Sequence, residues 1–249
     1  MERDRLQGRL HHLLHLRRLQ LVPGPAGRRQ GVRHLLGQGL DLEHQDDRRV
    51  AHPEDPLVPL PPASASSLTN PLLTPPTALL LTQHTYFNLD AFRNPDTSKI
   101  WEHTLHAPYS KRYLEADQAA LPTGKILTAE PNSINDFASA AGLTVGHARD
   151  QPGFAGNCGA DGACEGYNGY WLIEDAPKDA VVVTLASEFS GVKAELKTDQ
   201  PGVVLYSCNW MDGSADLKST QGIAGVNEKV IRSSCIAIEA QDYPDGINQ

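Results

Sequence analysis

The sequence predicts an all-β fold, an antiparallel β-sandwich over residues 79–249 that is incomplete as it stands. Short apolar runs of strand length recur in this part of the chain, bounded by Gly, Pro, Asn and Asp. The apolar residues show little of the 3.6-residue period of helices. Strands that follow one another with turn signals and no intervening helices are typical of antiparallel sandwiches.

Five runs are predicted to be strands, and they are residues 79–87, 180–187, 192–198, 202–207 and 230–239. The run 180–187 is apolar enough for a fully buried strand, whereas 192–198 alternates apolar and polar residues as a half-buried strand does. Ser190 and Gly191 between these two runs suit a tight hairpin turn. The one helix expected is short and lies at residues 136–143.

A break in composition near residue 80 separates two unlike segments. Residues 1–85 contain no Phe, Tyr, Trp, Ile, Cys or Lys. We therefore expect residues 1–78 to be a low-complexity Arg/Leu/Pro-rich segment that is disordered or translated in a wrong reading frame. Within it, the leucine spacing over residues 6–21 allows a short amphipathic helix, and residues 53–76 resemble an extended linker.

Composition also narrows the function classes. The formal net charge is −8, and the sequence shows no basic patch that could bind phosphate groups. Nucleic acid is therefore not expected as a partner. No uninterrupted apolar stretch approaches the length of a membrane-spanning helix, so we expect no membrane partner. A secretory signal is not visible, which makes the cytoplasm the default location. Secretion stays open if the true N-terminus differs from this one.

Cysteine and histidine positions suggest no metal site. Cys158 and Cys164 are close enough in sequence to pair in an oxidising compartment, whereas Cys208 and Cys235 lie on expected strands and are predicted to be buried thiols. His103 and His106 lack a third ligand at a suitable spacing. The Gly/Asp-rich loop 157–169 lacks the ligand spacing of a calcium loop.

Four segments occur in the order of one family's motifs. They are residues 81–89 (LTQHTYFNL), 119–126 (AALPTGKI), 198–209 (TDQPGVVLYSCN) and 235–249 (CIAIEAQDYPDGINQ). They resemble motifs of the aldose 1-epimerase (galactose mutarotase) family, and the Ser-Cys-Asn and Lys-Ser-Thr-Gln-Gly variants favour its fungal branch. The resemblance covers the C-terminal portion of such a protein and implies a β-sandwich of the galactose mutarotase type.

The resemblance implies an isomerase that interconverts the α and β anomers of free aldohexoses such as galactose and glucose. The reaction opens and recloses the sugar ring and needs no cofactor or metal. Glu239 matches the general base of the family and His84 the general acid, with a small-molecule sugar as the partner. The residues agree, because a carboxylate at the end of an apolar strand is partly desolvated and becomes a better base.

The resemblance also implies substrate contacts, some of which are altered here. Gln241, two residues after Glu239 in the family segment, is expected to bind substrate. Asn168 is also expected to do so, because it occupies the position of a family Asp that binds a sugar hydroxyl. Val204 replaces a family Gln, and nothing in residues 1–78 matches the upstream Arg and His-Gly-Gly motif. Two alternatives to catalysis therefore stay open, namely a non-catalytic carbohydrate-binding sandwich and an inactive truncated member.

Overall fold

A computed structural model describes residues 16–23, 80–159 and 164–248 of this chain. Apart from a short 3₁₀ helix at Gly246–Asn248, its regular structure is β-strand. The strands are β1 (Leu16–Pro23), β2 (Tyr86–Phe87), β3 (Thr104–His106), β4 (Arg112–Ala116), β5 (Pro122–Thr128), β6 (Asn168–Leu172), β7 (Val183–Ala186), β8 (Val192–Thr198), β9 (Gly202–Tyr206), β10 (Asp212–Asp216), β11 (Lys229–Ile231) and β12 (Ile236–Gln241).

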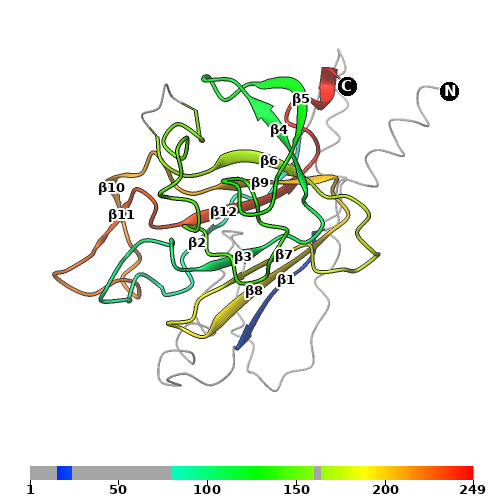
Figure 1. The fold of residues 1–249 in the computed structure, drawn as a ribbon. Helices are drawn as coiled ribbons and strands as arrows, with labels where there is room; N and C mark the ends of the chain where they lie inside the picture. Colours follow the sequence, from blue (N-terminus) through cyan, green and yellow to red (C-terminus); the bar gives the residue numbers. More distant parts are fainter. Residues whose placement is uncertain (1–15, 24–79, 160–163, 249) are drawn as a thin grey trace, which may run out of the picture.

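Two antiparallel sheets face each other across one hydrophobic core, as the sequence predicted (Figure 1). One sheet has the strand order β1-β8-β7-β3 and the other the order β2-β12-β9-β6-β4-β5, while β10 and β11 form a separate two-stranded ribbon. Apolar residues from both sheets fill the space between them, with Leu185 and Leu196 on one side and Leu205 and Ile236 on the other.

Strand β12 lies inside the larger sheet, between β2 and β9. All six of its residues are buried. Ile236, Ile238 and Ala240 belong to the inter-sheet core. Because successive side chains of a strand point to opposite faces, Ala237, Glu239 and Gln241 lie on the other face of this sheet, away from the core. We call that side the outer face.

The prediction for residues 192–198 is confirmed, because β8 has these bounds and buries Val192, Ala194 and Leu196 in alternation. The hairpin is confirmed as well. Gly191 turns the chain with φ of 67°, and its N–H donates to the Ser187 carbonyl. Strand β7 is shorter than predicted and buries only alternate residues, so it contributes one face to the core instead of being buried on both.

The run predicted as a strand over residues 79–87 pairs through its backbone only at β2. Upstream of β2, side chains replace the backbone ladder along the edge of β12. Gln83 Nε2 donates to the Ile238 carbonyl over 2.9 Å, and the Thr82 hydroxyl donates to the Ala240 carbonyl over 3.2 Å. These bonds satisfy the carbonyl groups of β12 without extending β2, and the segment that carries His84 is therefore not a strand.

The single strand predicted over residues 230–239 is wrong, since a turn divides it into β11 and β12. Ser233 adopts a left-handed conformation with φ of 63°. The Ser234 hydroxyl donates to the Ile231 carbonyl and accepts from the Ile231 N–H. Serine hydroxyl groups that bond nearby backbone compete with strand ladders in this way.

The helix expected at residues 136–143 is also wrong, because the segment is irregular, with a bend and one short turn but no helix. The Asp136 carboxylate accepts hydrogen bonds from the backbone N–H groups of Asn132, Ala138 and Ser139 and from the Ser139 hydroxyl. Burial alone raises the pKa of Asp136, but these hydrogen bonds outweigh it and hold the pKa below its usual value. The side chain thus takes the N–H groups of a turn that does not continue into a helix.

Near the N-terminus, residues 16–23 form β1, which pairs with β8 in antiparallel register. The part of the expected 6–21 helix that falls on these residues is therefore a strand. The remainder of that helix, most of the predicted 1–78 segment and the expected linker at 53–76 lie outside the described residues. In the described part of the chain, no helix has the length and apolar character needed to cross a membrane.

Candidate active site

Glu239 lies on the outer face of β12 and is buried, with 7% of its surface exposed. On the neighbouring strand β9, Val204 is paired with Glu239. Tyr206, two residues further along β9, is paired with Ala237. Burial raises the pKa of the Glu239 carboxyl, and the opposing effect of His84 only partly offsets this. Glu239 is therefore a carboxylate that holds a proton more readily than an exposed glutamate does.

His84 brings an imidazole to this carboxylate from the segment that precedes β2. Its Nε2 lies 3.2 Å from Glu239 Oε1, and 48% of its side chain is exposed. The Gln83 and Thr82 side-chain bonds to β12 fix the backbone on which His84 stands. The structure thus brings together the two residues that the sequence paired, one buried and one open to solvent.

Aromatic rings surround this pair on the outer face, and we call Tyr86, Tyr206 and Trp210 the aromatic shelf. The His84 ring lies 4.9 Å from the Tyr86 ring and 6.3 Å from the Tyr206 ring, measured between centroids. Tyr206 stacks on Trp210 at 5.6 Å with an interplanar angle of 16°. Burial, Tyr206 and Glu239 together raise the pKa of Tyr86, which keeps its hydroxyl protonated as a hydrogen-bond donor.

The shelf is open to solvent as well as continuous with the acid–base pair. Tyr86 is 47% exposed and Trp210 is 49% exposed. Ligand sites combine aromatic surface with a few polar groups, and the shelf beside His84 and Glu239 has this composition.

Of the predicted sugar contacts, Gln241 lies two residues after Glu239 on the same face and is buried. Asn168 is the first residue of β6 and is paired with Tyr206 on β9. Tyr206 is in turn paired with Ala237 on β12. Asn168 therefore lies on the outer face in the row of Tyr206, two strands from β12. Val204, directly opposite Glu239, places an apolar side chain beside the carboxylate.

Sequence reasoning missed Tyr86 and Tyr206 as members of this site. A signal for both was present, because Tyr86 is two residues from His84 and Tyr206 is two residues from Val204. In strands, residues two apart share a face. Of the three tryptophans that could contact a sugar, Trp101 and Trp171 are buried and Trp210 alone is exposed.

The cysteines differ in part from the prediction. Cys158 pairs with Cys164, as the sequence allowed, but Cys208 and Cys235 are also a disulfide and not free thiols. Both are buried, as expected. The sequence pattern does not predict this disulfide. Its two cysteines are 27 residues apart, and they come together only because β9 and β12 are neighbours in the sheet. This disulfide joins the end of β9 to the beginning of β12, next to the strand pair that carries Tyr206 and Glu239.

His103 is a structural residue in this fold. It is 1% exposed, and its Nε2 accepts a hydrogen bond from the Leu89 N–H over 3.1 Å. Burial lowers its pKa, against a smaller opposing effect of Asp90. Within residues 16–23, 80–159 and 164–248, no cluster of three or more His, Cys, Asp or Glu side chains could hold a metal ion.

The fold and this site define an all-β sandwich with a carboxylate–imidazole pair on an open sheet face, a class suited to acid–base chemistry on a small polar ligand. A sequence model described as aldose 1-epimerase matches residues 68–249. The chain belongs to the aldose 1-epimerase family.

Individual relatives agree with the family match. The chain is 31% identical over 198 residues to a "Probable aldose 1-epimerase" of Arthroderma benhamiae, which covers 71% of this chain and 43% of the relative. It is 28% identical over 173 residues to the "Galactose mutarotase" of Rattus norvegicus, with coverages of 70% and 44%. The chain therefore spans less than half the length of these curated relatives.

Among solved structures, the chain is similar to a GalM/aldose epimerase homologue from C. elegans. The TM-score is 0.48 and the sequence identity is 23%, over 66% of this chain and 42% of the other.

Proposed function

We propose that this chain is an aldose 1-epimerase that interconverts the α and β anomers of free aldohexoses such as galactose and glucose. The observation that carries the proposal is the contact between His84 Nε2 and Glu239 Oε1 at 3.2 Å on the outer face of β12. Family membership supports the same reaction, and the names of the relatives supply its substrate class.

The reaction needs one base and one acid at neighbouring oxygens. The anomeric hydroxyl oxygen and the ring oxygen of a pyranose are both bonded to C1. Groups 3.2 Å apart can therefore reach both at once when the sugar displaces their mutual contact. We assign Glu239 as the base that removes the proton of the anomeric hydroxyl and His84 as the acid that protonates the ring oxygen.

Electrons and protons balance in this scheme. As Glu239 takes the hydroxyl proton, the C1–O1 bond becomes a carbonyl, the bond from C1 to the ring oxygen breaks, and His84 gives its proton to that oxygen. Rotation about the C1–C2 bond presents the other face of the aldehyde, and the same two groups reverse their roles as the ring closes. The scheme uses no cofactor, and the raised pKa of Glu239 makes its carboxylate a stronger base toward the hydroxyl proton.

The remaining residues of the outer face are assigned to binding. The aromatic shelf suits the apolar C–H face of a sugar ring, since ligand sites combine aromatic surface with a few polar groups. Asn168 and Gln241 supply amides that both donate and accept hydrogen bonds to hydroxyl groups. Trp210, at the far end of the shelf from His84, would contact the edge of the ligand and not its reacting carbon.

A second candidate function is carbohydrate binding without catalysis. It is favoured by Val204, which lies opposite Glu239 where a polar contact is expected, and by the neutral Asn168. Polarimetry of freshly dissolved α-D-galactose decides between the two candidates. Catalysis predicts faster decay of optical rotation than in buffer, in proportion to protein concentration. Folded protein that binds galactose without accelerating the decay would support the second function instead.

A further inference from the structure

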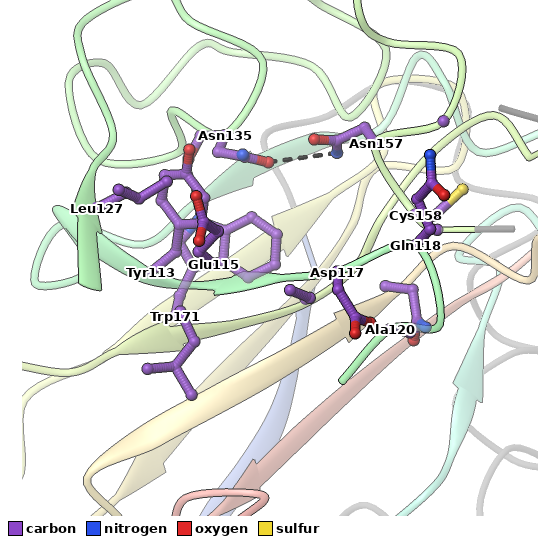
Figure 2. Close-up of a pocket in the computed structure, with 16 residues that line it drawn as sticks. Tyr113, Glu115, Asp117, Gln118, Ala120, Leu127, Asn135, Asn157, Cys158 and Trp171 are labelled. Atoms are coloured by element: carbon purple, nitrogen blue, oxygen red, sulfur yellow. Dashed lines mark hydrogen bonds between the residues drawn. The ribbon is translucent and has the colours of Figure 1, made fainter. Parts of the chain in front are cut away.

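A cavity lies on the core-facing side of the larger sheet, where β4 separates from β6. The two strands pair only at Tyr113 and Trp171, and beyond this point β4 continues with β5 alone. The opening has a volume of about 260 Å³. We call it the wedge pocket, and its lining includes Tyr113, Glu115, Asn135, Asn157, Asn168 and Trp171 (Figure 2).

One side of the wedge pocket is aromatic. The rings of Tyr113 and Trp171 lie 6.2 Å apart with a tilt of 35°, and Leu127 lies beside them in Figure 2. The Trp171 indole N–H is occupied, because it donates to the Asn135 carbonyl over 2.9 Å. Trp171 is 1% exposed and packs in the inter-sheet core, so the ring surface left for a ligand is that of the partly buried Tyr113.

Next to these rings, the wedge pocket is lined by two amides with unused hydrogen-bonding capacity. Asn157 Nδ2 donates to Asn135 Oδ1 over 3.3 Å and to the Gly166 carbonyl over 3.1 Å (Figure 2). Asn135 Nδ2 and Asn157 Oδ1 have no hydrogen bond within the described part of the chain. A donor and an acceptor therefore stand next to each other, as two adjacent hydroxyl groups require.

The two carboxylates that line the wedge pocket already have hydrogen-bond or ion-pair partners within the protein. Glu115 accepts a hydrogen bond from the Thr123 hydroxyl over 2.6 Å and lies 3.1 Å from Lys125 Nζ. Asp117 Oδ1 accepts from the backbone N–H groups of Ala119 and Leu121, both over 2.9 Å. Neither carboxylate is left as an isolated charge for a cationic ligand, and both disfavour an anion.

We propose that the wedge pocket binds one neutral, sugar-sized ring that carries several hydroxyl groups. The ring places its C–H face on Tyr113 and Leu127 and its hydroxyl groups on Asn135 and Asn157. The volume is below the range of about 300–1,000 Å³ that is usual for drug-sized ligands, which limits the occupant to a single ring. Asn168 is the one lining residue that is also assigned to the outer face, and neither Glu239 nor His84 lines the wedge pocket, so binding here can be measured apart from catalysis.

The three tryptophans separate the two sites in one experiment. Trp171 reports on the wedge pocket, Trp210 reports on the outer face, and buried Trp101 serves as the reference. Indole N–H signals of ¹⁵N-labelled full-length protein, assigned with single Trp→Phe variants, are followed during titration with methyl β-D-galactopyranoside. Its locked anomeric carbon prevents ring opening, so the result is independent of any epimerase activity.

We expect the Trp171 signal to shift and saturate at millimolar ligand. In Asn135→Ala, the loss of one hydrogen bond should weaken this binding about fivefold. Gln151→Ala removes an amide that lies outside the wedge pocket and donates to the Asn132 carbonyl, and it should leave the binding unchanged. A shift at Trp210 alone, no shift up to about 100 mM, or an unchanged titration in a well-dispersed Asn135→Ala spectrum would each overturn the proposal.

Discussion

The disulfide between Cys208 and Cys235 should be the stronger of the two covalent cross-links. It joins residues 27 apart, whereas Cys158 and Cys164 are 6 apart. On the chain-entropy estimate, a cross-link of the first length restricts the unfolded chain by about 3.5 kcal/mol and one of the second by about 2 kcal/mol. All four cysteines are buried, so removal of either pair loses packing as well, and the difference between the pairs comes from loop length.

Two double variants test this difference. One combines Cys208→Ala with Cys235→Ala, and the other combines Cys158→Ala with Cys164→Ala. Urea unfolding followed by tryptophan fluorescence measures both. With a slope of about 2 kcal/mol per molar urea, the first variant should lower the midpoint by about 2 M and the second by about 1 M. A thiol titration of the denatured, unreduced wild type should find no reactive thiol.

Three results would contradict this prediction. An equal or larger loss from the Cys158 and Cys164 variant would contradict the loop-length argument. A Cys208 and Cys235 variant as stable as the wild type would show that the pair does not restrict the chain. Two reactive thiols in the unreduced wild type would show directly that one pair is not formed.

Three further predictions concern the outer face. The acidic limb of the pH profile of kcat/KM should lie above the pKa of about 4.3 of an ordinary glutamate, because burial raises the pKa of Glu239 and only the carboxylate can act as base; a limb at or below that value would contradict the assignment. Trp210→Ala should raise KM for α-D-galactose severalfold and leave kcat within about twofold, since the ring binds the substrate edge; a fall in kcat alone would disprove this role. Asn168→Asp should lower KM about fivefold, because a charged acceptor strengthens a hydroxyl contact; unchanged kinetics would place Asn168 outside the sugar site.

Local patterns in the sequence predicted part of this fold well. Alternation over residues 192–198 predicted β8 and its buried face, since that pattern depends only on neighbouring residues and one sheet. The run 230–239 failed for an equally local reason. Its serines bond nearby backbone, and apolar content alone does not show that Ser233 turns the chain.

Only those residues of the candidate site that match a family motif could be predicted from the sequence. His84 and Glu239 are 155 positions apart, and their contact arises because Gln83 and Thr82 bind carbonyl groups of β12. The wedge pocket had no sequence signal at all, since it exists only where β4 diverges from β6. Contacts set by the pairing of distant strands are not encoded in any short window of sequence.

The variant Glu239→Gln tests whether Glu239 and His84 together catalyse anomer exchange. Gln keeps the shape of the side chain and its contact with His84 but cannot accept a proton. It also removes a charge whose burial raises the Glu239 pKa, so the variant should unfold at the same temperature as the wild type or higher.

The decisive measurement is the rate at which the optical rotation of fresh α-D-galactose decays with wild type and Glu239→Gln at equal concentration. We predict that wild type accelerates the decay and that the variant loses at least about 100-fold of that acceleration while it remains folded. A folded variant that accelerates the decay as fast as wild type would contradict the assignment of Glu239 as the base.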